Sequence, residues 1–162
     1  MRVSAKVDYA VRAVVELAAA GGGPLKGEQL AHAQDIPLKF LENILIELRQ
    51  AGIVRSQRGP DGGYWLARSA DEVNVADVIR AVEGPLASVR GERPEEIDYG
   101  GSAETLQRVW IALRGAMREV LETVTLADLA KGSLPVPVEK RARDPESWEP
   151  MESRLGVRTR SR

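Results

Sequence analysis

A glycine-rich turn between two short segments of β-strand character constrains this fold more than any other feature. The segments are residues 53–58 and 64–67, and the turn between them reads GPDGG over residues 59–63. This pattern predicts a β-hairpin, and its glycines let the backbone of the turn approach another molecule closely. Because the hairpin follows directly on a segment with helical periodicity, we interpret it as the wing of a winged-helix domain.

Three helices are predicted ahead of the hairpin. The first is capped by Ser4 and ends at the glycine run before Pro24. The second covers about residues 27–34, and the third runs from Pro37 to about Gln50, with a stripe of leucine and isoleucine that we expect to be buried. Two short helices this close together are a candidate helix-turn-helix. The predicted fold class is therefore mainly α with a small β-hairpin wing.

A long helix is predicted behind the wing, after a helix of residues 75–82 and a loop. It covers about residues 102–123, and apolar residues recur along it with alternating spacings of four and three. A heptad repeat of this kind is typical of a helix that pairs with another helix. The predicted dimer seam consists of Leu106, Trp110, Leu113, Met117, Val120 and Val124.

The chain divides into four predicted parts. Residues 1–84 form the winged helix-turn-helix domain, and residues 85–101 form a loop. Residues 102–134 hold the long dimerisation helix and a short helix that Thr125 can cap. Residues 135–162 are rich in proline and show little periodicity, which predicts a flexible tail.

Composition excludes several classes of function. The 162 residues include no cysteine and one histidine, which excludes disulfides, thiolate metal sites, iron–sulfur clusters and cysteine nucleophiles. No nucleophile–base pair or carboxylate pair stands out, so we expect neither an enzyme nor a bound cofactor or metal. No apolar run is long enough for a membrane span, and Asp8 falls where a signal peptide would be apolar. We therefore expect a cytoplasmic protein that does not contact a membrane.

The charge is distributed unevenly along the chain, although the net charge is only −1. Residues 1–68 hold nine basic and seven acidic side chains, whereas residues 69–134 hold seven and twelve. A polyanion would prefer the first segment and avoid the second. Ordinary scatter of surface charge explains the same counts equally well.

Four stretches of the sequence resemble the Rrf-two family of winged helix-turn-helix transcription regulators, to which the iron–sulfur cluster regulator belongs. They read SAKVDYAVRA (residues 4–13), FLENIL (40–45), AGIVRSQRGPDGGY (51–64) and VADVIRAVEGP (75–85). The resemblance covers about residues 1–131. It implies a homodimer joined by the long helix and a double-stranded DNA operator with two-fold symmetry. By the family's pattern the third helix enters the major groove, and the wing lies against the backbone and the minor groove.

The sequence departs from this family at one place. Members that sense through an iron–sulfur cluster hold it with three cysteines in the loop before the long helix. Residues 86–99 contain no cysteine here, and Asp8, where some members have a fourth ligand, cannot hold a cluster alone. The resemblance is therefore to a member that lacks the cluster cysteines. An effector, if one acts on this protein, would bind between the first helix and the long helix, beside this loop.

The third helix carries the first group of candidate DNA contacts. Near its N-terminus, Lys39 can reach guanine or phosphate, Glu42 a cytosine amino group and Asn43 an adenine. A solvated helix face is the alternative interpretation of Glu42. Lys6 and Arg2, at the start of the first helix, are further candidates for contact with the DNA backbone, with ordinary surface charge as the alternative.

The wing carries the second group. Arg58 stands at the turn, where an arginine can enter a narrow minor groove. Ser56 and the backbone amides of Gly59 and Gly62 can donate hydrogen bonds to phosphates.

The sequence therefore favours a homodimeric, sequence-specific DNA-binding transcription regulator, with repression as the expected outcome. The alternative is a winged-helix module that binds proteins or serves as a scaffold without binding DNA. The two differ in what they require of Lys39 and Arg58. An interaction module could lose both side chains at little cost, so their presence favours the regulator.

Overall fold

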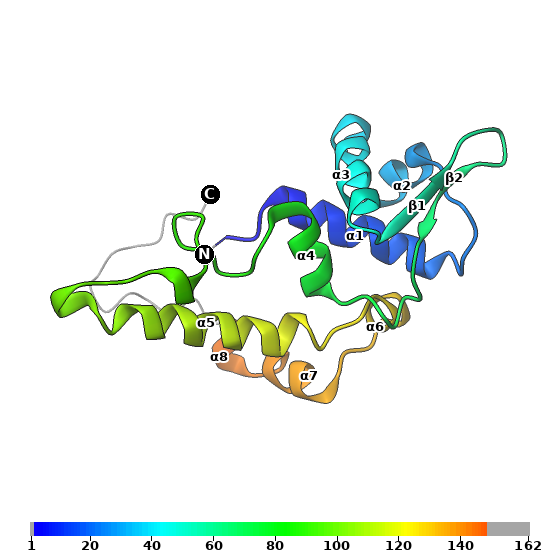
Figure 1. Ribbon diagram of the computed structural model, residues 1–162. Helices are drawn as coiled ribbons and strands as arrows, with labels where there is room; N and C mark the ends of the chain where they lie inside the picture. The colour runs from blue at the N-terminus through cyan, green and yellow to red at the C-terminus, as the bar shows by residue number, and fades with distance from the viewer. Residues whose placement is uncertain (1, 149–162) are drawn as a thin grey trace.

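The computed structural model describes residues 2–148 and consists of a compact winged-helix domain with a long helical arm. Figure 1 shows the domain at one end of the molecule and the arm extending away from it. The domain contains the helices α1 (Ala5–Ala19), α2 (Gly27–Gln34), α3 (Leu38–Gln50) and α4 (Val75–Glu83) and the strands β1 (Val54–Gln57) and β2 (Gly63–Leu66). This confirms the predicted fold class.

Local signals place the first three helices. The Oγ of Ser4 caps α1 by accepting a hydrogen bond from the backbone N–H of Val7 at 3.1 Å. Asp35 adopts a left-handed conformation with φ of 50° at the end of α2, which lets the chain turn sharply into α3. Helix α3 packs against α1, and the side chains that it buries are the predicted stripe of Leu41, Ile44, Leu45 and Leu48.

The wing is an antiparallel hairpin with an additional edge that the sequence did not predict. β1 and β2 pair with Val54 opposite Leu66 and Gln57 opposite Gly63. Leu25, in the connection between α1 and α2, forms a β-bridge with Tyr64 through two backbone hydrogen bonds of 2.8 and 2.9 Å. This bridge ties the base of the wing to the helical domain.

The arm consists mainly of α5 (Leu106–Leu121). Two short 3-10 helices, η1 (Pro94–Glu96) and η2 (Gly101–Ala103), lie in the loop before it. Helix α6 (Leu126–Lys131) follows α5 and returns to the winged-helix domain, where it packs against α1. The backbone N–H of Leu126 donates to the carbonyl oxygen of Val73 at 2.9 Å, and the Leu126 side chain is fully buried. Helix α6 therefore contacts the winged-helix domain, while the predicted division groups it with the dimerisation helix.

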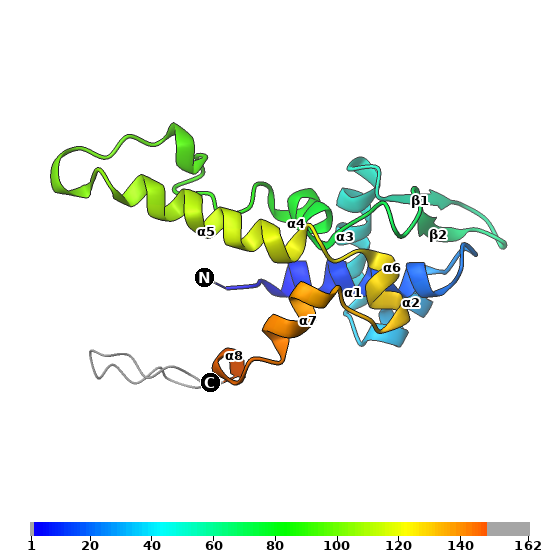
Figure 2. The ribbon, with the colours of Figure 1, turned by 90° about the horizontal axis from the view of Figure 1, so that it is seen from below.

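Two short helices, α7 (Val136–Ala142) and α8 (Pro145–Trp148), follow α6. Figure 2 shows α7 and α8 extending from the winged-helix domain on one side of α5. The sequence predicts a flexible tail from residue 135, so the helices within residues 136–148 differ from that expectation. The remainder of the predicted tail, residues 149–162, lies outside the described residues.

Candidate nucleic-acid interface

The first turn of α3 presents polar side chains to solvent. The side chain of Lys39 is 97% exposed, and its Nζ lies 3.4 Å from Oε2 of Glu42. Asn43 is also exposed, on the next turn. Residues near the N-terminus of a recognition helix are the ones that reach base edges. The arrangement therefore provides a cation, an acceptor and an amide on one accessible surface, with the cation partly neutralised by its neighbour.

Phe40 is an exposed aromatic side chain on the same turn, and it is not among the contacts predicted from the sequence. It is 43% exposed and meets the ring of Tyr9 edge to face, with 5.7 Å between the ring centroids. The guanidinium of Arg12 lies 5.5 Å from the Tyr9 centroid. An apolar side chain at this position can contact the methyl group of thymine. In the sequence Phe40 is a large apolar residue of a helix, which by itself does not separate an exposed side chain from a buried one.

The wing presents Arg58 at its tip. Arg58 is exposed, and Gly59 beside it has φ of 113°, a conformation that glycine adopts without strain. Gly62 is buried, and its backbone N–H donates to the carbonyl oxygen of Gly59 at 3.0 Å. The turn itself uses that amide, which removes Gly62 from the donors available to a phosphate.

A side-chain hydrogen bond connects the recognition helix with the wing. Nη1 of Arg49, in the last turn of α3, donates to Oγ of Ser56 in β1 at 3.2 Å. Both side chains are polar, and both could turn to a phosphate. The bond couples the position of the wing to that of α3. Arg49 was missed because nothing in its local sequence shows that it lies beside the strand.

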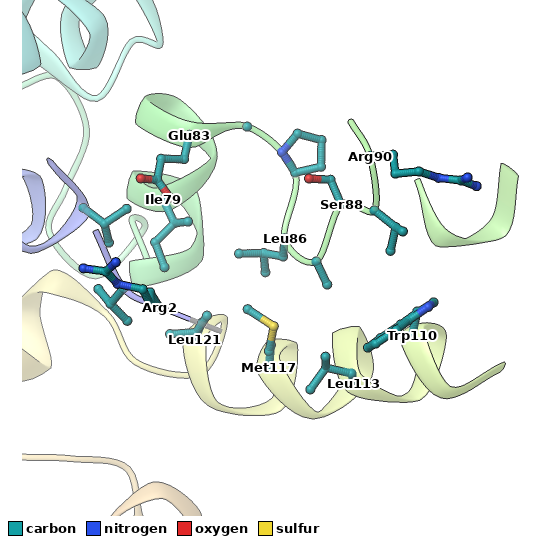
Figure 3. Close-up of a pocket in the computed structure, with 16 residues that line it drawn as sticks. Arg2, Ile79, Glu83, Leu86, Ser88, Arg90, Trp110, Leu113, Met117 and Leu121 are labelled. Carbon is teal, nitrogen blue, oxygen red and sulfur yellow. The ribbon is translucent and has the colours of Figure 1, made fainter. Parts of the chain in front are cut away.

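The structure separates the two candidates near the N-terminus from this surface. Nζ of Lys6 lies 2.7 Å from Oε2 of Glu47 and donates to the carbonyl oxygen of Val82 at 2.7 Å. The ammonium group of Lys6 therefore joins α1 to α3 and α4. Arg2 lines a cavity between α4 and α5, as Figure 3 shows. Neither side chain is grouped with Lys39 and Arg58.

A winged helix-turn-helix with an exposed recognition helix and an exposed wing-tip arginine defines a class of protein, the DNA-binding transcription regulators. Comparison with known proteins agrees with this class. The sequence profile of iron-dependent transcriptional regulators named Rrf2 matches residues 3–132. The chain belongs to the Rrf2 family, the Rrf-two family whose motifs are quoted above.

Individual relatives support this assignment over most of the chain. Rv1287 of Mycobacterium tuberculosis, assigned as an HTH-type transcriptional regulator, is 51% identical over 150 residues, which is 92% of this chain and 93% of that one. The regulator CymR of Bacillus subtilis is 36% identical over 80% of this chain and 90% of its own. The structure of CymR, the global cysteine regulator of B. subtilis, matches with a TM-score of 0.69 at 34% identity, covering 82% of this chain and 98% of that chain.

An IscR structure extends the comparison to a second branch of named regulators. IscR of T. potens matches with a TM-score of 0.67 at 34% identity, covering 82% of this chain and 88% of that chain. These relatives are transcription regulators and not enzymes, in agreement with the expectation from the sequence.

The residues of the loop before α5 do not fit an iron–sulfur cluster. The whole sequence contains no cysteine, and a cluster needs thiolate ligands or a mixture of thiolate and histidine. Within residues 2–148, no three histidine, aspartate or glutamate side chains come together in a way that could hold a metal ion. This loop contributes Arg93, which faces the arginines of α5 across a groove. A groove lined by arginine side chains attracts anions and repels cations.

Among the helices that the structure describes, none combines the length and the apolar character needed to cross a lipid bilayer.

Proposed function

We propose that this protein is a homodimeric repressor that binds a two-fold symmetric DNA operator without an iron–sulfur cluster. The observation that carries the proposal is the joint exposure of Lys39 and Asn43 on α3 and Arg58 on the wing. Figure 1 shows α3 and the wing projecting from the same side of the winged-helix domain. A helix in the major groove and a wing on the neighbouring minor groove need this arrangement.

The surface of α5 supports the dimer. No side chain of α5 is fully buried in the described chain, and Val109, Ile111 and Leu106 are 51%, 37% and 36% exposed. An amphipathic helix that extends from its domain is stable only when another surface covers its apolar face. We infer that α5 of a second copy covers this face.

The predicted seam is shared between the chain's own core and the proposed partner. Trp110, Leu113 and Met117 are half-buried and line a cavity of about 740 Å³ between α5 and the loop after α4, shown in Figure 3. Val120 lines a second groove against α7, and Val124 is 5% exposed in the domain core. We therefore place the dimer contact on the N-terminal and middle turns of α5.

The same cavity coincides with the place predicted for an effector. Its walls are largely apolar, and Ile79, Leu86 and Met117 are among the side chains that form them. Its volume is within the range of small-molecule sites. The cavity lies beside the proposed dimer face. A molecule bound there would therefore contact the elements that set the spacing of the two winged-helix domains, which are the reading domains of the dimer.

Repression is the outcome we propose because a dimer bound over a promoter excludes other proteins from the same DNA. The relatives are regulators of bacteria, whose DNA lies in the cytoplasm, and we propose the same location for this protein. The proposal thus needs only a reading domain and a dimer arm. Domain boundaries at residues 84, 101 and 134 remain proposals, with α6 reassigned to the reading domain on its packing against α1.

Two measurements test the proposal. Sequences selected from random duplex DNA should share a two-fold symmetric motif, and their affinity should fall steeply as salt rises. Sedimentation should show a dimer, which Val109→Glu should convert to monomers, while Val136→Glu, a matched change at an 80% exposed valine of α7, should not. Failure to enrich any motif would favour the interaction module, and a persistent Val109→Glu dimer would contradict the α5 interface.

A further inference from the structure

Four arginines line a groove of about 460 Å³ between α4 and α5. Arg80 comes from α4, Arg93 from the loop, and Arg114 and Arg118 from α5. Glu95 is the one acidic side chain among the residues that line the groove. Neither α3 nor the wing contributes to it. The arginine groove is therefore separate from the nucleic-acid interface.

Ion pairs neutralise only part of this charge. Arg114 pairs with Glu95, while Arg80 and Arg118 share the carboxylate of Glu122, which lies 3.0 Å from Nε of Arg118. Asp77 adds a contact of 3.5 Å to Nη1 of Arg80. Arg93 forms no salt bridge with the described residues, although its charge acts on Glu95 at longer range. The groove therefore keeps an excess of positive charge.

The carboxylates beside the groove stay ionised at neutral pH. Hydrogen bonds from Arg80 and Arg118 lower the pKa of Glu122. The pKa of Glu95 is lowered by a backbone hydrogen bond and by Arg114. Both carboxylates therefore carry a full negative charge at neutral pH. The positive charge that remains in the groove is thus charge that they do not neutralise.

We propose that the arginine groove binds a small molecule with two or more negative charges on phosphate groups, such as a compound with a pyrophosphate. The planar guanidinium presents paired N–H donors that match phosphate oxygens. Arg93 can meet one phosphate, and Arg118, whose side chain is 55% exposed, can meet a second. The volume of the groove is that of a site for a small molecule rather than for a macromolecule.

The position of the groove suggests what such a ligand would change. Arg80 and Glu122 form an ion pair that joins α4 of the reading domain to α5 of the arm. A phosphate that competes for Arg80 or Arg118 would weaken this connection and alter the setting of the arm against the domain. This regulatory consequence rests on the proposed function, whereas binding of the ligand does not.

Calorimetric titration of the full-length protein with inorganic pyrophosphate, in a phosphate-free buffer of low ionic strength, tests the site. The wild type should bind saturably. Arg93→Gln, which removes an unpaired cation, should weaken binding about ten-fold, as expected for the loss of one charged hydrogen bond. Glu95→Gln, which removes the competing carboxylate of Arg114, should strengthen it. Arg108→Gln, an exposed arginine of α5 outside the groove, should leave it unchanged.

Three results would overturn the site. They are a wild type that does not bind pyrophosphate saturably, an Arg108→Gln variant weakened as much as Arg93→Gln, and an Arg93→Gln variant that loses affinity for operator DNA without pyrophosphate. The last would assign the groove to the DNA backbone. Circular dichroism of each variant shows that it is folded. Operator binding by the wild type without pyrophosphate tests the proposed function separately, so the two failures can be distinguished.

Discussion

Arg58→Ala is the sharpest perturbation of the proposed DNA interface. Arg58 is exposed at the tip of the wing, and it forms no salt bridge with the part of the chain that the structure describes. Its removal therefore leaves no partner unsatisfied, and the free energy of unfolding should change by less than about 0.5 kcal/mol. Any larger effect on DNA binding is then an effect on the interface.

The expected loss of affinity follows from the two-fold symmetry of the proposed complex. One arginine that contacts DNA contributes about 1–3 kcal/mol. Two wings contact one operator in the proposed complex, so with additive contributions the dimer should lose about 2–6 kcal/mol. Each cation that replaces counterions contributes about 0.9 to the slope of log affinity against log salt, so this slope should fall by about 2.

Fluorescence anisotropy with a labelled operator, over a series of salt concentrations, measures both quantities. Arg143→Ala is the matched control, because Arg143 is an exposed arginine at the end of α7, outside α3, the wing and the proposed dimer face of α5. If Arg58→Ala keeps both the affinity and the salt slope of the wild type, the wing does not contact DNA. If Arg143→Ala loses as much, the effect is one of total charge and not of the wing.

Four further outcomes are expected. Leu45→Ala, at a fully buried position of α3, should lower the free energy of unfolding by about 2–5 kcal/mol, measured by urea denaturation. Gly62→Ala would place a Cβ against the carbonyl oxygen of Gln57, so it should displace the wing and weaken operator binding more than it lowers stability. The backbone N–H of Thr125, and to a smaller extent its hydroxyl, donate hydrogen bonds that lower the pKa of Asp128. The stabilisation that these bonds provide should be present above about pH 4 and lost as pH falls through the lowered pKa. In a series of melting curves at different pH, Asp128→Asn should therefore reduce the dependence of the melting temperature on pH in this range. Protein purified without oxygen should contain no iron and no visible absorbance, since the chain has no cysteine; iron in stoichiometric amount would contradict the ligand argument.

The elements of the reading domain could be predicted closely because their signals are local. Ser4 and Thr125 cap helices in the structure as predicted, and Asn74 caps α4 in the same way. Each of the three side chains accepts a hydrogen bond from the backbone N–H three residues ahead. The predicted stripe of α3 is buried as a unit. Helix α5 starts at Leu106, later than predicted, because residues 101–103 form a 3-10 turn.

The candidate site was less predictable than the elements that carry it. Lys39 and Arg58 could be proposed because helix and hairpin geometry alone places them at a helix N-terminus and at a turn. Phe40 could not be distinguished from a core residue, because its exposure depends on how α1 packs against α3. The role of Lys6 was equally hidden, since its partner Glu47 is remote in sequence.

The sequence alone therefore determined the order and type of the elements and the absence of thiolate ligands, because caps, turns, periodicity and residue inventory do not depend on distant contacts. Only the tertiary structure decided which charges meet. It directs Lys6 to Glu47, returns α6 to α1 and gathers Arg80, Arg93, Arg114 and Arg118 around one groove. The physical reason is that electrostatic interactions act over a few ångströms of space, whereas these residues are separated by long stretches of chain.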